Sequence, residues 1–121
     1  MKLIDPARGQ AALDACLTAL GAGGQPERAQ LLTAVRFTLA RFERAHPGHS
    51  VEVRVPPAGA IQAIAGPRHT RGTPPNVVET DPVTWLRLVT GTLEWRDAVS
   101  AGTVTASGNR ADLTDYLRGQ Q

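Results

Sequence analysis

Cysteine, aromatic residues and long apolar runs are all scarce in this chain, and each shortage excludes a class of protein. The single cysteine, Cys16, excludes an internal disulfide framework and a zinc site built from several cysteines. No apolar run approaches the roughly 18 residues of a membrane-spanning helix, and the first residues do not resemble a signal peptide. We therefore expect a cytoplasmic protein in a reducing compartment, without integral membrane association.

A strong charge of one sign is absent as well. Thirteen basic residues, of which only Lys2 is a lysine, stand against eleven acidic ones, so the formal net charge is +2. The arginines are scattered rather than gathered in a block. Aromatic residues make up 4% of the chain, too few for a platform on which bases could stack. We expect no nucleic-acid partner.

What the chain does have is enough apolar sequence for one folded unit. Its 121 residues are 41% hydrophobic, which suits a single domain over residues 1–121. Apolar residues at helical spacing between prolines and glycines predict helices, and alternating apolar residues predict strands. The expected helices are 6–20, 26–45, 82–90, 93–101 and one after the capping residue Asn109; the expected strands are 51–55, 60–65, 77–80 and 103–106. This order, α-α-β-β-β-α-α-β-α, predicts an α+β fold with helices covering one face of a small mixed β-sheet.

Two details of the hydrophobic pattern lead to further predictions, one about Phe37 and one about residues 60–65. Phe37 lies nearly opposite the apolar face of its helix, which carries Val35 and Leu39. Either the first helix, with its glycine-rich linker in residues 1–24, or a partner covers this ring, or Phe37 is a single exposed aromatic. Residues 60–65 are almost continuously apolar, which predicts a strand covered on both faces.

The sequence carries no motif for catalysis. It has no nucleophile elbow, phosphate-binding loop or dinucleotide fingerprint. Cys16 lies on the apolar stripe of the first helix, where a buried structural thiol is expected. His46 and His49 flank a turn but lack a clear third ligand for a metal ion. We expect no catalytic residues, no metal and no cofactor.

The most unusual segment is the loop 66–75, which contains no hydrophobic residue. Arg68, His69 and Arg71 place three hydrogen-bond donors within four residues, with glycines at both ends. Guanidiniums there are suited to an anionic head group or to the acidic patch of a partner. The alternative is that the arginines tie the loop to acidic residues of this chain: Glu79, Asp81 or Asp97.

The second half of the chain resembles a known family. The resemblance lies in Val77-Val78-Glu79-Thr80-Asp81-Pro82-Val83-Thr84-Trp85-Leu86-Arg87-Leu88, Gly91-Thr92-Leu93, Asp97-Ala98-Val99, Gly102-Thr103-Val104 and Ser107-Gly108-Asn109. These motifs are similar to those of the sterol carrier protein type 2 (SCP-2-like) superfamily. The string from Pro56 through Pro82 resembles its actinobacterial branch of bacterial sterol carrier orthologues, and the similarity extends from about Glu27 onward. That branch is similar to the C-terminal domain of mycothiol-dependent maleylpyruvate isomerases, whose metal-binding helical bundle this chain lacks.

The resemblance implies a non-catalytic intracellular lipid carrier with an apolar cavity between its helices and sheet. Its ligand would be a fatty acid, an acyl-CoA or a sterol-like molecule, with the head group at Arg68, His69 and Arg71. Seven apolar residues would line the cavity: Leu32, Val35, Ile61, Ile64, Trp85, Leu88 and Val99. The alternative is a protein-interaction or regulatory module with a filled cavity, which uses the arginine-rich loop and Phe37 as its contact surface. A homodimer is left open.

Overall fold

The structure, a computed structural model, describes residues 3–66, 76–118 and 120 of the chain. Two helices open it, α1 (Pro6–Gly21) and α2 (Arg28–Ala45), and three strands follow, β1 (Val51–Val55), β2 (Gly59–Ala63) and β3 (Val77–Thr80). The second half contains α3 (Pro82–Val89), α4 (Trp95–Ala101), β4 (Val104–Ser107) and α5 (Thr114–Arg118). The predicted order of elements and the α+β class are confirmed.

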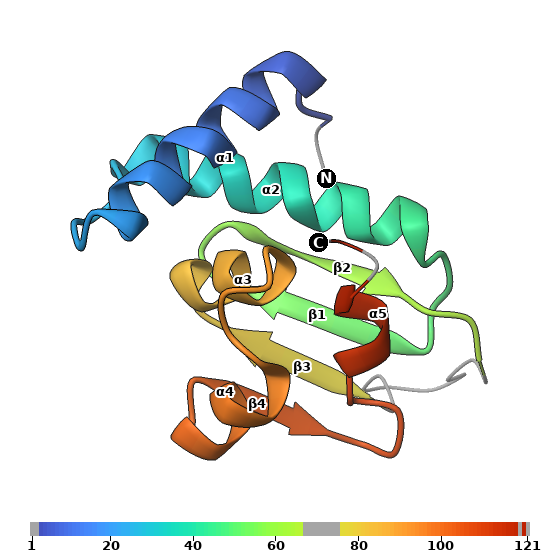
Figure 1. Cartoon of the computed structure of the whole chain (residues 1–121). Coiled ribbons are helices and arrows are strands. Elements are labelled where there is room, and N and C mark those ends of the chain that lie inside the picture. Colours follow the sequence, from blue (N-terminus) through green and yellow to red (C-terminus); the bar gives the residue numbers. More distant parts are fainter. Residues whose placement is uncertain (1–2, 67–75, 119, 121) are drawn as a thin grey trace.

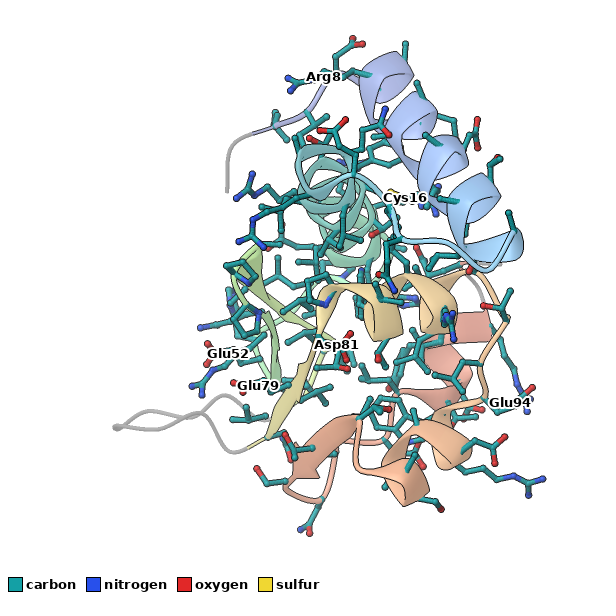
Figure 2. The ribbon with its side chains drawn as sticks, turned by 90° about the vertical axis from the view of Figure 1, so that its left-hand side faces the viewer. Arg8, Cys16, Glu52, Glu79, Asp81 and Glu94 are labelled. Carbon is teal, nitrogen blue, oxygen red and sulfur yellow. The ribbon has the colours of Figure 1, made fainter. Side chains whose placement is uncertain are left out.

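Alternating valines in β1 set the two faces of the sheet. The strand order is β2-β1-β3-β4, with β1 and β3 parallel and the two outer pairs antiparallel. The valines of β1 are fully buried, whereas Glu52 and Arg54 between them point to the opposite face. The helices lie on one side of the sheet (Figure 1), and no described helix covers the face that carries Glu52 and Glu79 (Figure 2). The prediction of a mixed sheet covered on one face is confirmed.

Strand β2 differs from the prediction of a strand covered on both faces. Ile61 and Ala63 are buried, but Ala60 and Gln62 are exposed. The strand lies at the edge of the sheet, and the helices cover only one of its faces. The prediction from the apolar run was wrong because alanine counts as an apolar residue in a sequence, yet its side chain is small enough to be exposed at little cost in free energy.

Helix α1 packs along α2 (Figure 1), and its residue Gly9 lies against the ring of Phe37. The carboxylate of Asp5 accepts a hydrogen bond from the backbone N–H of Arg8 at 3.1 Å, and Pro6 begins the helix, as predicted. A Cβ atom at Gly9 would overlap the ring of Phe37, so only a residue without a side chain permits this approach. Phe37 is 9% exposed. The first helix therefore provides the predicted cover, and the alternative of an exposed aromatic is wrong.

The core between α2, α3 and the sheet contains a fully buried tryptophan, Trp85. Its Nε1–H donates to Oγ1 of Thr38 at 2.9 Å, and the Thr38 hydroxyl donates to the carbonyl of Ala34, also at 2.9 Å. The ring of Phe42 meets Trp85 edge-on, with centroids 5.6 Å apart. Trp95 is also buried. Both tryptophans of the chain therefore belong to the core.

Two expectations for the second half are wrong in detail. Val99 is expected to line an interior cavity, but α4 turns Ala98 inward instead and leaves Val99 42% exposed. The last helix begins later than expected, and its first turn is capped by Asp112 rather than Asn109. The hydroxyl and backbone N–H of Thr114 donate to Oδ1 of Asp112 at 2.6 and 2.9 Å. Both hydrogen bonds lower the pKa of Asp112, and the bond from the Thr114 hydroxyl has the larger effect.

Candidate functional site

The apolar residues predicted to line a cavity occupy different parts of the molecule. Five belong to the buried core, each at most 5% exposed: Val35, Ile61, Ile64, Trp85 and Leu88. Leu32 is half-buried and packs against this core, whereas Val99 lies outside it. The structure thus brings six of the seven residues together and contradicts the interior position of Val99, because the shorter Ala98 occupies that side of α4.

Most of these core residues are not walls of the pockets found between described residues. Five such pockets have volumes from about 240 to about 530 Å³, and neither Val35, Trp85 nor Leu88 lines any of them. Close packing of a core removes the space that a ligand would need. The candidate site must therefore be sought where the described surface is hollowed.

The predicted head-group residues, Arg68, His69 and Arg71, lie outside the described residues. The described residues before and after this segment are connected by hydrogen bonds through Ser50. The backbone N–H and the hydroxyl of Ser50 donate to the carbonyl of Ile64 at 3.1 and 2.8 Å, and Nδ2 of Asn76 donates to the carbonyl of Ser50 at 2.7 Å. Both ends of the segment are therefore held at one buried residue.

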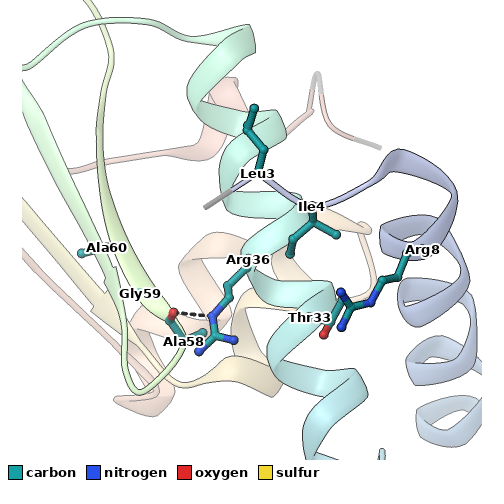
Figure 3. A pocket seen from close by; sticks show the side chains of 8 residues that line it. All are labelled: Leu3, Ile4, Arg8, Thr33, Arg36, Ala58, Gly59 and Ala60. Atoms are coloured by element: carbon teal, nitrogen blue, oxygen red, sulfur yellow. Dashed lines mark hydrogen bonds between the residues drawn. The ribbon is translucent and has the colours of Figure 1, made fainter. Parts of the chain in front are cut away.

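The largest of these hollows lies between α1, α2 and the turn that joins β1 to β2. We call it the Arg8–Arg36 pocket; its volume is about 530 Å³. Figure 3 shows the side chain of Arg8 reaching from α1 toward Thr33 on α2, and that of Arg36 reaching from α2 to the turn. The pocket is lined by Leu3, Ile4, Arg8, Thr33, Arg36, Ala58, Gly59 and Ala60.

A second, smaller pocket continues along α2. It has a volume of about 320 Å³ and shares Leu3 and Ile4 with the first. The shared residues place the short segment before α1 between the two hollows. The remaining lining comprises Asp5, Pro6, Phe37, Ala40 and Arg44. We call the two pockets together the α2 groove, and both volumes fall in the range of about 300–1,000 Å³ typical of small-molecule sites.

The groove combines apolar side chains with arginines, and only its larger pocket has no acidic side chain in its lining. Leu3 is 79% exposed although it is a large hydrophobic residue, and Ile4 is half-buried against the core. At the turn, Nε of Arg36 donates to the carbonyl of Ala58 at 2.8 Å, so this guanidinium is held in place by one donor while its others remain free among described residues. In residues 3–66, 76–118 and 120, the only ion pair joins Arg54 to Glu52.

Comparison with known proteins assigns the family. Residues 27–118 match the family described as bacterial SCP ortholog. The chain belongs to this family. The predicted membership of the SCP-2-like superfamily is thus confirmed, whereas the actinobacterial branch and the relation to maleylpyruvate isomerases stay predictions. The match begins after α1, so Leu3, Ile4 and Arg8 precede the residues that this chain shares with the bacterial SCP ortholog family.

Two solved structures are similar to this chain. The crystal structure of sterol carrier protein-2 like-3 from Aedes aegypti is 16% identical over 78% of this chain and 97% of that chain, with a TM-score of 0.38. A conserved hypothetical protein from Thermus thermophilus, described as possibly a sterol carrier protein, is 18% identical over 99% of this chain and 87% of that chain, with a TM-score of 0.35. No curated protein matches this member of the bacterial SCP ortholog family.

Sequence analysis missed the arginine pair because each member looks like an ordinary polar position of a helix. Arg8 and Arg36 are far apart in the sequence and line the same pocket only because α1 packs along α2. One signal was available: Arg36 stands between Val35 and Phe37, both buried, so its side chain leaves the helix beside the core. No helix in the described ranges combines the length and apolar character needed to cross a membrane.

Proposed function

We propose that this chain is a non-catalytic lipid carrier that holds a hydrocarbon chain in the α2 groove. The observation that carries the proposal is the exposed Leu3, which together with Ile4 lines both pockets of the groove. The smaller pocket is also lined by Phe37 and Ala40. Covering such side chains with a lipid chain removes their apolar surface from water, at roughly 25 cal/mol per Å². Membership of the bacterial SCP ortholog family supports a lipid ligand.

The shape of the groove favours a flexible acyl chain, as in a fatty acid or an acyl-CoA, over a rigid sterol. Leu3 and Ile4 divide the space into about 530 and about 320 Å³. A flexible chain can bend past the dividing side chains, whereas a fused ring system needs one undivided volume.

The groups that line the groove support binding rather than chemistry. They are guanidiniums, the Thr33 hydroxyl, the Asp5 carboxylate and apolar side chains, and the Asp5 carboxylate already caps α1. Cys16, the one thiol, is fully buried, and burial raises its pKa, with a smaller contribution from Glu27. A protonated, inaccessible thiol is a poor nucleophile.

The test is lipid uptake by the purified, delipidated protein, followed by native mass spectrometry and by titration with dodecanoate. The variant Ala40→Trp should fill the smaller pocket and reduce uptake at least about tenfold, the scale of one bulky apolar group lost from a ligand contact. The control is Ala45→Trp, an exposed position on the same helix that lines neither pocket.

Three outcomes separate the claims. Uptake by the wild type and Ala45→Trp but not by Ala40→Trp supports a carrier that uses the α2 groove. Equal uptake by all three proteins would place the lipid elsewhere. If the wild type takes up no lipid, the carrier function is wrong.

A further inference from the structure

Two arginines without a carboxylate partner among described residues face one pocket. Arg8 and Arg36 both line the Arg8–Arg36 pocket, and Figure 3 shows their guanidiniums on the two sides of Thr33. No acidic side chain belongs to that lining. Guanidiniums with free N–H groups bind carboxylate and phosphate oxygens through charge-assisted hydrogen bonds. The pocket therefore has the chemistry of an anion site.

The fold fixes the guanidinium of Arg36 and the backbone of Arg8. Arg36 is half-buried, and its Nε–H donates to the carbonyl of Ala58, which directs the rest of the guanidinium toward the turn. Arg8 lies in the first turn of α1, whose start is capped by Asp5 and whose next residue, Gly9, packs on Phe37. The Arg36 half of the site is positioned before a ligand arrives, which reduces the entropy lost on binding, whereas the exposed side chain of Arg8 is free to close on the anion.

The neighbouring charges distinguish this end of the groove from the other. The smaller pocket also has an arginine, Arg44, but it contains the Asp5 carboxylate as well. An anion is thus favoured at Arg8 and Arg36, with its apolar part lying toward Leu3 and Ile4, which line both pockets.

We propose that Arg8 and Arg36 form a clamp for the carboxylate or phosphate group of a single-chain amphiphile. This inference rests on the proposed carrier function, because it takes the chain of the ligand to lie in the α2 groove. It adds to the carrier function the class of head group, an anion, and the two residues that bind it. Arg8 precedes residue 27, where the family match begins, so half of the clamp lies outside the residues that match the family.

The experiment compares three probes by isothermal titration: dodecanoate, dodecan-1-ol and inorganic phosphate. The decisive variant is Arg8→Gln, because Arg8 is exposed and its side chain makes no described hydrogen bond, so the fold should tolerate the change. Arg36→Gln is the second variant. Because it also loses the hydrogen bond to Ala58, its stability is measured separately by thermal unfolding. The matched control is Arg87→Gln, which removes the same charge from an exposed position on α3.

We expect Arg8→Gln to weaken dodecanoate binding by about tenfold or more, the effect of losing one hydrogen bond to a charged group. Dodecan-1-ol binding should change by less than about twofold, since the apolar contacts are untouched. Arg87→Gln should bind both probes as the wild type does. Arg36→Gln should show the same selective loss if it remains folded.

The remaining outcomes contradict specific parts of the proposal. If the wild type binds both amphiphiles and Arg8→Gln binds dodecanoate equally well, the clamp is wrong and the carrier function stands. If inorganic phosphate binds as tightly as dodecanoate, the ligand is a free anion and the amphiphile is wrong. If the wild type binds none of the probes, the carrier function and the clamp fail together.

Discussion

The hydrogen bond between Thr38 and Trp85 shows what a single polar residue does inside this core. The indole N–H of Trp85 is fully buried, and Oγ1 of Thr38 is its acceptor at 2.9 Å. Thr38 can accept because its own proton is donated back to the carbonyl of Ala34. A buried N–H without a partner loses its water contacts with no compensation. One hydroxyl on α2 thereby fixes the orientation of the largest side chain in the core.

Replacement of Thr38 by valine should lower the free energy of unfolding by about 1–3 kcal/mol, the cost of a buried donor without an acceptor. Urea titration followed by tryptophan fluorescence measures this change. The control Thr38→Ser keeps the hydroxyl and should lose only about 0.8 kcal/mol for one methyl group. If valine and serine destabilise the protein equally, the hydrogen bond does not stabilise the fold.

At the scale of the element, the contact between α1 and α2 depends on one glycine. Gly9 is buried against Phe37 and leaves no room for a Cβ atom, whereas Gly21 at the end of α1 has nothing within 4 Å of the corresponding position. The two glycines therefore differ in a way that helix propensity alone does not distinguish. This difference makes them a matched pair.

The substitution Gly9→Ala should destabilise the protein by about 1–3 kcal/mol through overpacking, although alanine favours a helix over glycine. Gly21→Ala should leave the stability unchanged or raise it slightly. Thermal unfolding monitored by circular dichroism compares the two variants. A rise in stability for Gly9→Ala equal to that for Gly21→Ala would show that α1 does not pack closely on Phe37.

The helices and strands also show which structural features can be predicted from sequence patterns. The starts of α1 and α3 at residues 6 and 82 were predicted correctly because they are set by local interactions: Asp5 and Asp81 cap these helices through hydrogen bonds to nearby backbone N–H groups. The exposure of Val99 and the open face of β2 were missed because they depend on which side of an element the rest of the chain covers. The placement of Arg8 and Arg36 around one pocket depends on how α1 packs on α2. Neither the hydrophobic period of a helix nor the spacing of residues in a motif contains this information.

At the scale of the whole molecule, α1 is a layer on α2 that lies outside the family match. The match to the bacterial SCP ortholog family begins at residue 27, and α1 ends at Gly21. Its buried residues, among them Leu13 and Cys16, face the rest of the protein. Removal of this layer uncovers apolar surface on α2, including the ring of Phe37. Large exposed apolar patches promote association.

Deletion of residues 1–24 should therefore produce a species that associates with increasing concentration, measured by size-exclusion chromatography with light scattering. Phe37→Ser in the shortened chain should reduce this association, because it removes the largest newly exposed side chain. The full-length protein at the same concentrations is the control. A shortened chain that stays monomeric and as stable as the full-length protein would contradict the role of α1 as a cover.

The two ends of the segment between Ile64 and Asn76 are both tied to Ser50. The described residues that precede and follow residues 67–75 are thus held together at one buried point beside β1. A change in the length of the chain between two fixed points does not alter the distance between them. A reporter or affinity tag inserted between these points should therefore leave the register of β1 and β3 intact, which makes this part of the chain a practical place to label the protein.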